Sequence, residues 1–211
     1  MTTPFDQERI AVLGTGNVGR TLAHGWARAG AEVLLAGRDA ARTAEAAEGT
    51  GAAPTSPSAA LASATIVVLA VPSTGLDEAV AGLVNLASGT LLIDATNGRV
   101  DGQPTPISAR AQIEAAAPQC VYARAFNSTA WENMGEPTLD GRPVDLLWCG
   151  PDGSDGERVA ALGRTLGMRP VRLGDASKTE ALDGLTALWF ALAFEAGHGR
   201  RVAFGVQGLD A

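Results

Sequence analysis

The chain has few of the side chains on which many enzymes rely for acid–base or metal chemistry. Its 211 residues include one tyrosine (Tyr122), one lysine (Lys178), two histidines and two cysteines. A Tyr-x-x-x-Lys pair, which marks the short-chain dehydrogenases, is therefore excluded. No group of histidine, cysteine and carboxylate residues has the spacing of a metal site. We therefore predict no metal centre and assign no catalytic side chain.

The sequence also lacks the features of membrane proteins and nucleic-acid-binding proteins. Its most apolar stretch, Leu185 to Phe194, is far shorter than the roughly 20 residues that a membrane-spanning helix needs. The net charge is −7 and no run of basic residues stands out, so nucleic acid is not an expected partner. The first ten residues contain acidic side chains and no apolar signal-peptide core. We expect a cytoplasmic protein.

The scarce cysteines and histidines each have an ordinary structural interpretation. Cys120 and Cys149 lie in apolar runs, so we predict buried free thiols, with a disulfide or a reactive pair as the alternative. His24 falls on the polar side of a predicted helix and is expected to be solvated. His198 follows the last predicted helix, where it caps the helix or pairs with its dipole; a role in a site is the alternative.

Short strand-like runs alternate with helical stretches along most of the chain. This alternation predicts an α/β protein with a doubly wound, mainly parallel sheet. The predicted strands cover residues 10–14, 32–37, 65–72, 90–97, 120–126, 144–150 and 169–174. The predicted helices cover residues 17–30, 38–49, 76–86, 107–116, 154–167 and 177–197, with a short helix in the loop 50–64.

A glycine motif joins the first predicted strand to the first predicted helix. Gly14-Thr15-Gly16-Asn17-Val18-Gly19 has the spacing G-x-G-x-x-G in the context that the dinucleotide fingerprint requires. The first glycine permits a tight turn, the second lets the backbone approach a pyrophosphate, and the third lets the helix pack on the strand. The helix N-terminus offers free N–H groups to the phosphates. A turn without a ligand is the alternative.

The end of the second predicted strand favours NADP over NAD. An NAD site has an acidic residue here, but this chain has Ala36 and Gly37, followed by Arg38. Arg38 can hold a 2′-phosphate and stack on the adenine, and Arg42 lies one helical turn further on. Asp39 is expected to cap the next helix and to face away. The alternative is that both arginines are solvated surface residues.

Three other strand ends are candidates for the nicotinamide side of the site. Ligands of doubly wound sheets lie outside the carboxyl ends of the strands. These ends are Ala70-Val71-Pro72, the segment 94–98 with Asn97, and the segment 125–129 with Asn127. Either asparagine could bind the ligand or simply cap its loop. Hydride transfer between two ring cofactors needs mainly their alignment, which suits a chain without an obvious proton donor.

Several segments together resemble the family of NADPH:coenzyme F420 oxidoreductases, which shares a superfamily with the cytosolic domains of the ferric-reducing STEAP membrane proteins. These segments are VLGTGNVGRTLAHGWARAG, LLAGRDAAR, VVLAVP, LIDATNG, ARAFNSTAWENM and ALWFALAFEAGHGRRVAFGV. The resemblance implies a Rossmann-like domain with a small C-terminal extension, a homodimer, and hydride transfer between NADPH and a deazaflavin (coenzyme F420) or flavin-like acceptor. It also implies that NADPH is held by Thr15, Gly16, Asn17, Val18, Arg38 and Arg42.

The chain departs from this family pattern at two positions. Gly37 stands where the family often has serine or threonine, so one hydrogen bond to the 2′-phosphate is missing. Ser73 stands where deazaflavin enzymes of the family often have an aromatic or bulky residue. By the same resemblance, the segment 125–129 lines the pocket of the second cofactor.

We expect residues 1–140 to form the dinucleotide-binding domain and residues 141–211 a C-terminal extension packed on it, in one compact unit. Residues 185–194 are apolar nearly all round, which predicts burial in a dimer, over the nicotinamide pocket, or in an ordinary core. Two other functions stay open. One is an NADPH-dependent reductase of a small imine or carbonyl compound, and the other is a non-catalytic NADP-binding or sensing protein.

Overall fold

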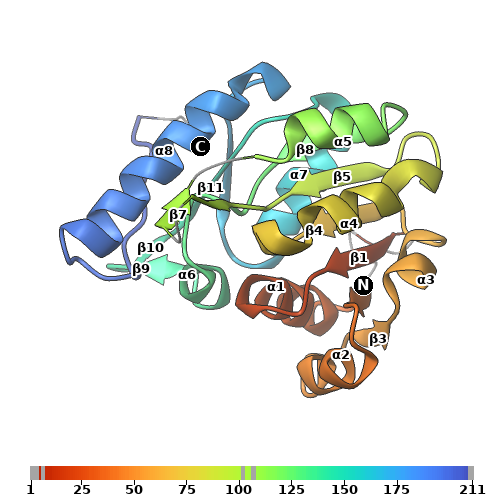
Figure 1. Ribbon diagram of the computed structural model, residues 1–211. Helices are drawn as coiled ribbons and strands as arrows, with labels where there is room; N and C mark the ends of the chain where they lie inside the picture. Colours follow the sequence, from red (N-terminus) through yellow and green to blue (C-terminus); the bar gives the residue numbers. More distant parts are fainter. Residues whose placement is uncertain (1–4, 6–7, 101–102, 106–107, 209–211) are drawn as a thin grey trace.

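A parallel sheet with the strand order β3-β2-β1-β4-β5-β8 forms the centre of the molecule (Figure 1). The computed structural model describes residues 5, 8–100, 103–105 and 108–208. The chain first builds outward from β1 to β3 and then crosses to β4 on the other side of β1, which makes a topological switch point between β1 and β4. The strands are β1 (Arg9–Leu13), β2 (Glu32–Ala36), β3 (Ala53–Thr55), β4 (Ile66–Leu69), β5 (Leu91–Asp94) and β8 (Val121–Arg124).

Helices cover both faces of this sheet, and this explains its continuous apolar strands. Every residue of β4 and of β5 is buried, as expected for parallel strands that have no solvent-facing side. The predicted doubly wound α/β fold is therefore confirmed. The helices are α1 (Asn17–Arg28), α2 (Ala40–Ala47), α3 (Pro57–Leu61), α4 (Leu76–Ala81), α5 (Arg110–Ala116), α6 (Trp131–Gly135), α7 (Gly153–Thr165) and α8 (Thr179–Phe190).

Each face of the sheet has its own core. On one face α3, α4 and α5 pack through Ala60, Val80 and Ile113. On the other face α1 and α7 pack together, with Trp26 at their centre. The Trp26 indole N–H donates to the carbonyl of Leu162 at 3.0 Å, and its ring meets Phe126 edge to face. Because α7 lies beyond residue 140, the two parts of the chain share one core.

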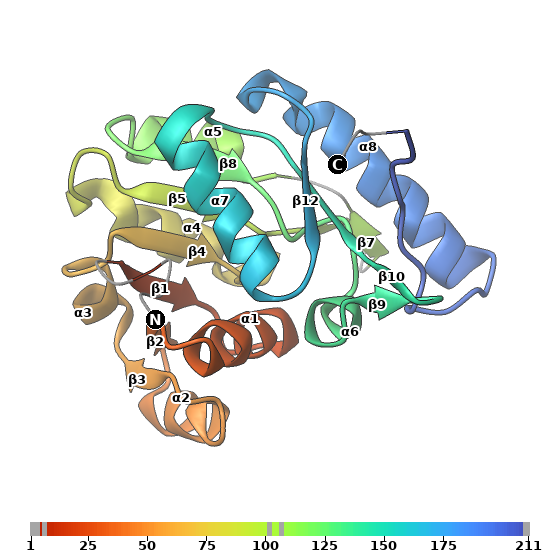
Figure 2. The ribbon, with the colours of Figure 1, turned by 180° about the vertical axis from the view of Figure 1, so that it is seen from behind.

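The C-terminal part forms a separate two-stranded sheet, and Figure 2 shows its strand β12 beside α7 and α8. The strands β11 (Asp145–Trp148) and β12 (Arg169–Arg172) pair in parallel, and α7 connects them in the sequence. A single antiparallel bridge between Arg124 and Cys149 joins them to β8. Two hairpins complete the strands: β6 (Gly98–Val100) with β7 (Gln103–Thr105), and β9 (Thr138–Leu139) with β10 (Arg142–Pro143).

Some sequence predictions need correction. The predicted helix 76–86 is α4 with a 3-10 turn at each end, Ser73–Gly75 and Gly82–Asn85. The predicted start of the helix at Ile107 lies outside the described residues, and α5 begins at Arg110. The edge strand β3, both hairpins and α6 were not predicted. Cys120 and Cys149 are free thiols as expected, but only Cys149 is fully buried; burial raises the pKa of both.

Within the single chain the last helix is buried on one side, so the burial of its other apolar side stays a prediction from the sequence. In α8 the face with Leu182, Thr186 and Trp189 is buried. In contrast, Leu188 is 50% exposed, and Phe194, in the π-helical turn Ala191–Glu195 that follows α8, is 47% exposed. The contacts of a single chain therefore leave a second apolar face open, and the homodimer stays a prediction. No helix within the described residues is both long and apolar enough to span a membrane.

Candidate cofactor-binding site

The first and third glycines of the motif are required by the protein's own packing. Gly14 has φ +122°, and a Cβ added there would lie 2.3 Å from the carbonyl oxygen of Ala70. A Cβ at Gly19 would lie 1.9 Å from the carbonyl oxygen of Gly14. Both distances are far below van der Waals contact. The tight turn and the close contact between helix and strand that the sequence predicted are both present.

The second glycine faces open space instead. A Cβ at Gly16 would meet no atom within 4 Å. Gly16 is the N-cap of α1, and no side chain caps the free N–H groups of the first turn. The positive end of the helix dipole and these unpaired donors are thus directed at an open position, which is what a pyrophosphate requires. The residues present fit this group.

A cleft of about 970 Å³ begins at the glycine turn and runs past the end of β2, between α2 on one side and α3 and α4 on the other. Cofactor sites commonly have volumes in this range. The predicted site residues that line it are Gly14, Thr15, Gly16, Gly37, Arg38, Arg42, Val71 and Pro72. The remaining predicted residues, which do not line it, are Asn17, Val18, Ala70, Asn97 and Asn127.

Two guanidinium groups border this cleft at the end of β2. Arg38 pairs with Glu78 at 3.0 Å, and both side chains are well exposed. Such an exposed ion pair contributes little free energy, so Glu78 does not prevent Arg38 from binding a phosphate. Asp39 accepts a hydrogen bond from the backbone N–H of Arg42 at 3.0 Å, so it caps α2 as predicted. The carboxylate that adjoins Arg38 in sequence is therefore engaged by the helix.

The packing around Gly37 explains why this position has no side chain. A Cβ there would lie 2.5 Å from Thr43 Oγ1 and 2.8 Å from Thr15 Cγ2. The Thr43 hydroxyl donates to the carbonyl of Asp39 at 2.6 Å, whereas the Thr15 hydroxyl has no partner among the described residues. Two threonines thus fill the place of the serine or threonine that the family pattern has at position 37. Thr43 was not recognised from the sequence, because only the fold brings it to Gly37.

The side chains of the two asparagines at the other strand ends form hydrogen bonds within the protein. Asn97 Nδ2 donates to the carbonyl of Asn127 at 2.9 Å. Asn127 is 2% exposed, and its Nδ2 donates to Thr186 Oγ1 on α8 at 3.0 Å. The Oδ1 atom of Asn127 accepts no hydrogen bond from the described residues. Of the two roles predicted for these residues, the structural one is present, and ligand binding stays a prediction.

A buried arginine that the sequence analysis missed holds these strand ends together. Arg124 is fully buried at the end of β8. Its NH1 donates to Asp94 Oδ1 at 3.0 Å and its NH2 to Asp183 Oδ1 at 2.7 Å. NH2 also donates to Asn97 Oδ1 at 3.2 Å. Burial raises the pKa of the Asp183 carboxyl, and the charge of Arg124 opposes this shift. A charged residue inside the run CVYARAF was the available sequence signal.

The single tyrosine belongs to the same network. Tyr122 is 9% exposed and its hydroxyl donates to Asp94 Oδ2 at 3.1 Å. Burial and the negative charge of Asp94 raise the pKa of Tyr122 far above its ordinary value. Tyr122 therefore keeps its proton and acts as a structural donor. Within the described residues, no group of three or more His, Cys, Asp or Glu side chains could hold a metal ion.

The parallel sheet, its switch point, the open glycine turn and the adjoining cleft define a Rossmann-type dinucleotide-binding protein. Residues 9–98 match the family model described as NADP oxidoreductase, coenzyme F420-dependent. The match runs from β1 to the start of β6 and includes the glycine turn, Arg38, Arg42 and the loop with Val71 and Pro72. It confirms, over these residues, the family resemblance recognised in the sequence.

Solved structures extend the likeness over nearly the whole chain. A protein from Arthrobacter sp. FB24, named provisionally as an F420-dependent NADP reductase, is 25% identical with a TM-score of 0.80, over 94% of this chain and 99% of its own. A reductive aminase from Aspergillus terreus, in complex with NADPH and ethyl-5-oxohexanoate, shares the fold at 20% identity with a TM-score of 0.65. That match covers 90% of this chain and 63% of the aminase. No curated protein matches the chain in sequence.

Proposed function

We propose that the protein is an NADPH-dependent oxidoreductase that transfers hydride between NADP(H) and a flavin-like or deazaflavin acceptor such as coenzyme F420. The observation that carries the proposal is the continuous cleft from the open position at Gly16 to Arg38 and Arg42. It offers backbone donors for a pyrophosphate and two guanidinium groups for a 2′-phosphate. The family match over residues 9–98 supports the same chemistry.

Each part of the proposed site has a binding role for the dinucleotide. The backbone of residues 14–18 holds the pyrophosphate, and Arg38 and Arg42 hold the 2′-phosphate. The free Thr15 hydroxyl replaces the hydrogen bond that Gly37 cannot provide. Ala70, Val71 and Pro72 border the nicotinamide, which supplies the hydride when the cofactor is bound. Asn97 and Asn127 shape the strand ends beside it.

The strand ends favour a ring acceptor over a simple ketone. Tyr122 is buried and hydrogen-bonded to Asp94, so it does not serve as a proton donor. Transfer between two rings needs their alignment more than a protein acid. Reduction of a small imine or carbonyl compound, with water as the proton source, is the second candidate. The fold shared with a reductive aminase favours that candidate.

The test is to mix the purified protein with NADPH and oxidised coenzyme F420 and to follow the visible absorbance of the deazaflavin. We expect rapid bleaching. If the protein binds NADPH and no bleaching occurs, the deazaflavin assignment is wrong. Turnover with an imine or carbonyl compound would then support the second candidate. Tight NADPH binding without turnover of any acceptor would indicate a sensing protein.

Replacement of Arg38 by alanine should weaken NADPH binding about tenfold to 100-fold, because a charge-assisted hydrogen bond is worth roughly 1.5–3 kcal/mol. NADH binding should change less than about twofold, since NADH lacks the 2′-phosphate. Titration of both cofactors by calorimetry measures this difference. Arg9→Ala is the matched control: Arg9 also forms an exposed ion pair, with Glu32 at 2.6 Å, at the opposite end of β1. Equal losses for NADPH and NADH in Arg38→Ala would exclude a 2′-phosphate contact.

A further inference from the structure

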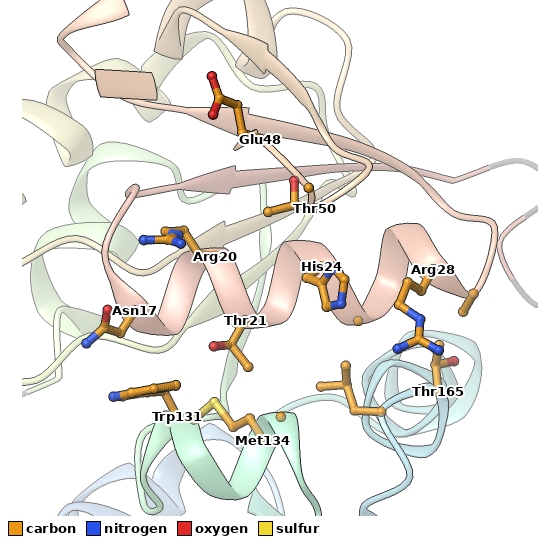
Figure 3. Close-up of a pocket in the computed structure, with 15 residues that line it drawn as sticks. Asn17, Arg20, Thr21, His24, Arg28, Glu48, Thr50, Trp131, Met134 and Thr165 are labelled. Carbon is orange, nitrogen blue, oxygen red and sulfur yellow. The ribbon is translucent and has the colours of Figure 1, made fainter. Parts of the chain in front are cut away.

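A second cavity lies along α1 (Figure 3) and shares no lining residue with the cleft already described. It is a groove of about 830 Å³ lined by α1, by residues 48–50 after α2, by α6 and by the C-terminal end of α7. The glycine turn separates the two cavities, since Gly16 lines the first and Asn17 lines the second. Figure 3 shows Asn17 and Trp131 at one end of the groove and Arg28 with Thr165 at the other.

One wall of this groove is a stripe of cationic and polar side chains. Arg20, His24 and Arg28 follow one another at intervals of four residues, so they share one face of α1. At 1.5 Å per residue they span about 12 Å along the helix axis. Neither arginine forms an ion pair with any described residue, although the protein as a whole carries a charge of −7. The acidic residue in the lining is Glu48.

The opposite wall is largely apolar. Trp131 and Met134 belong to α6, and Leu166 is the C-cap residue of α7. Asn17 follows the carboxyl end of β1, and Trp131 lies beyond the carboxyl end of β8, so this end of the groove lies at the edge of the sheet where the dinucleotide is proposed to bind. A ligand that starts beside the dinucleotide has a continuous path along α1, with positive charges on one side and an apolar wall on the other.

We propose that this groove binds the anionic chain of the electron acceptor, a chain that carries phosphate or carboxylate groups, while the acceptor's ring lies against the nicotinamide. This inference rests on the proposed function. The spacing of Arg20 and Arg28 suits an extended ligand with successive negative groups, and Trp131 contacts the apolar portion between ring and chain. The groove gives affinity through charge, and the strand ends give the alignment of the rings.

The experiment compares two acceptors in calorimetric titrations of the NADP⁺-saturated protein. One is oxidised coenzyme F420, and the other is its deazaflavin ring portion without the phosphate-bearing chain. The variant is Arg20→Gln combined with Arg28→Gln. The matched control is Arg142→Gln, an exposed arginine of β10 that does not line the groove. Thermal melting and the affinity for NADP⁺, which we expect to stay unchanged, are measured first for every variant.

We expect the double variant to bind coenzyme F420 at least about tenfold more weakly, and the ring portion with less than about a twofold change. The control should change neither affinity. If coenzyme F420 binds the double variant as tightly as the unmodified protein, the groove inference is wrong while the acceptor assignment stands. An equal loss for both ligands also overturns it, because the chain is then not the group recognised. If neither ligand binds the unmodified protein, the inference and the deazaflavin assignment both fail.

Discussion

The Gly16→Ala variant should fold and melt like the unmodified protein and yet bind NADPH about 100-fold more weakly, a loss of about 2.7 kcal/mol. The added methyl group meets no protein atom within 4 Å, so the protein itself does not resist it. It projects instead into the open position above the first turn of α1, where the pyrophosphate needs direct contact with backbone N–H groups. Calorimetric titration with NADPH and a thermal melt measure the two effects separately.

Two other glycine variants make this result specific. Gly205→Ala also adds a methyl group in open space, but in the C-terminal segment far along the chain, and should change neither property. Gly19→Ala places a methyl group 1.9 Å from the Gly14 carbonyl oxygen and should lower the melting temperature. If Gly16→Ala keeps its affinity for NADPH within about threefold, the pyrophosphate does not lie on this turn.

Replacement of Arg124 by methionine should lower the free energy of unfolding by about 3–5 kcal/mol, the usual cost of removing one partner from a buried ion pair. The variant leaves the fully buried Asp94 carboxylate, and the Asp183 carboxylate, whose side chain is 14% exposed, without their shared cation. It also removes a hydrogen bond from Asn97. Urea unfolding followed by circular dichroism measures the loss.

Arg142→Met removes an exposed arginine and is the control, with an expected change of less than about 0.5 kcal/mol. Arg124→Lys tests whether geometry matters as well as charge. A single ammonium group cannot reproduce the forked contacts to Asp94 and Asp183, so this variant should lie between the other two. A stability of Arg124→Met equal to that of the control would show that the buried network contributes nothing to folding.

Local sequence signals predicted what depends on local structure. The strands β1 and β4 follow from uninterrupted apolar runs, and the cap at Asp39 follows from its position before an alanine-rich helix. The glycine turn could be predicted because its spacing is local to the sequence: Gly14 and Gly19 are required by close contacts within the protein, and Gly16 leaves open space at the start of α1. Arg38 and Arg42 could be assigned to the cleft because the end of β2 fixes their place.

Features that depend on distant parts of the chain were not predicted. The edge strand β3 contains Pro54, which opposes a strand prediction but is tolerated at a sheet edge. From the sequence, Arg124 is a charged residue in an apolar strand without a partner, because its partner Asp183 comes from α8. The stripe of Arg20, His24 and Arg28 is regular in the sequence, but it becomes a groove only because Trp131 packs opposite. Thr43 is only six residues from Gly37, but its contact with Gly37 also depends on how the chain turns into α2 and was not predicted.

The hydrogen bond from Trp26 to Leu162 has a consequence for how this protein can be rearranged. It joins α1, where the pyrophosphate is proposed to bind, to α7, which lies more than 100 residues further along the chain. The segment that carries the glycine motif therefore does not form a complete packing unit by itself. A fragment that ends before α7 would leave the indole of Trp26 in contact with water. Recombination between relatives, or the engineering of chimaeras, would have to exchange α1 and α7 together.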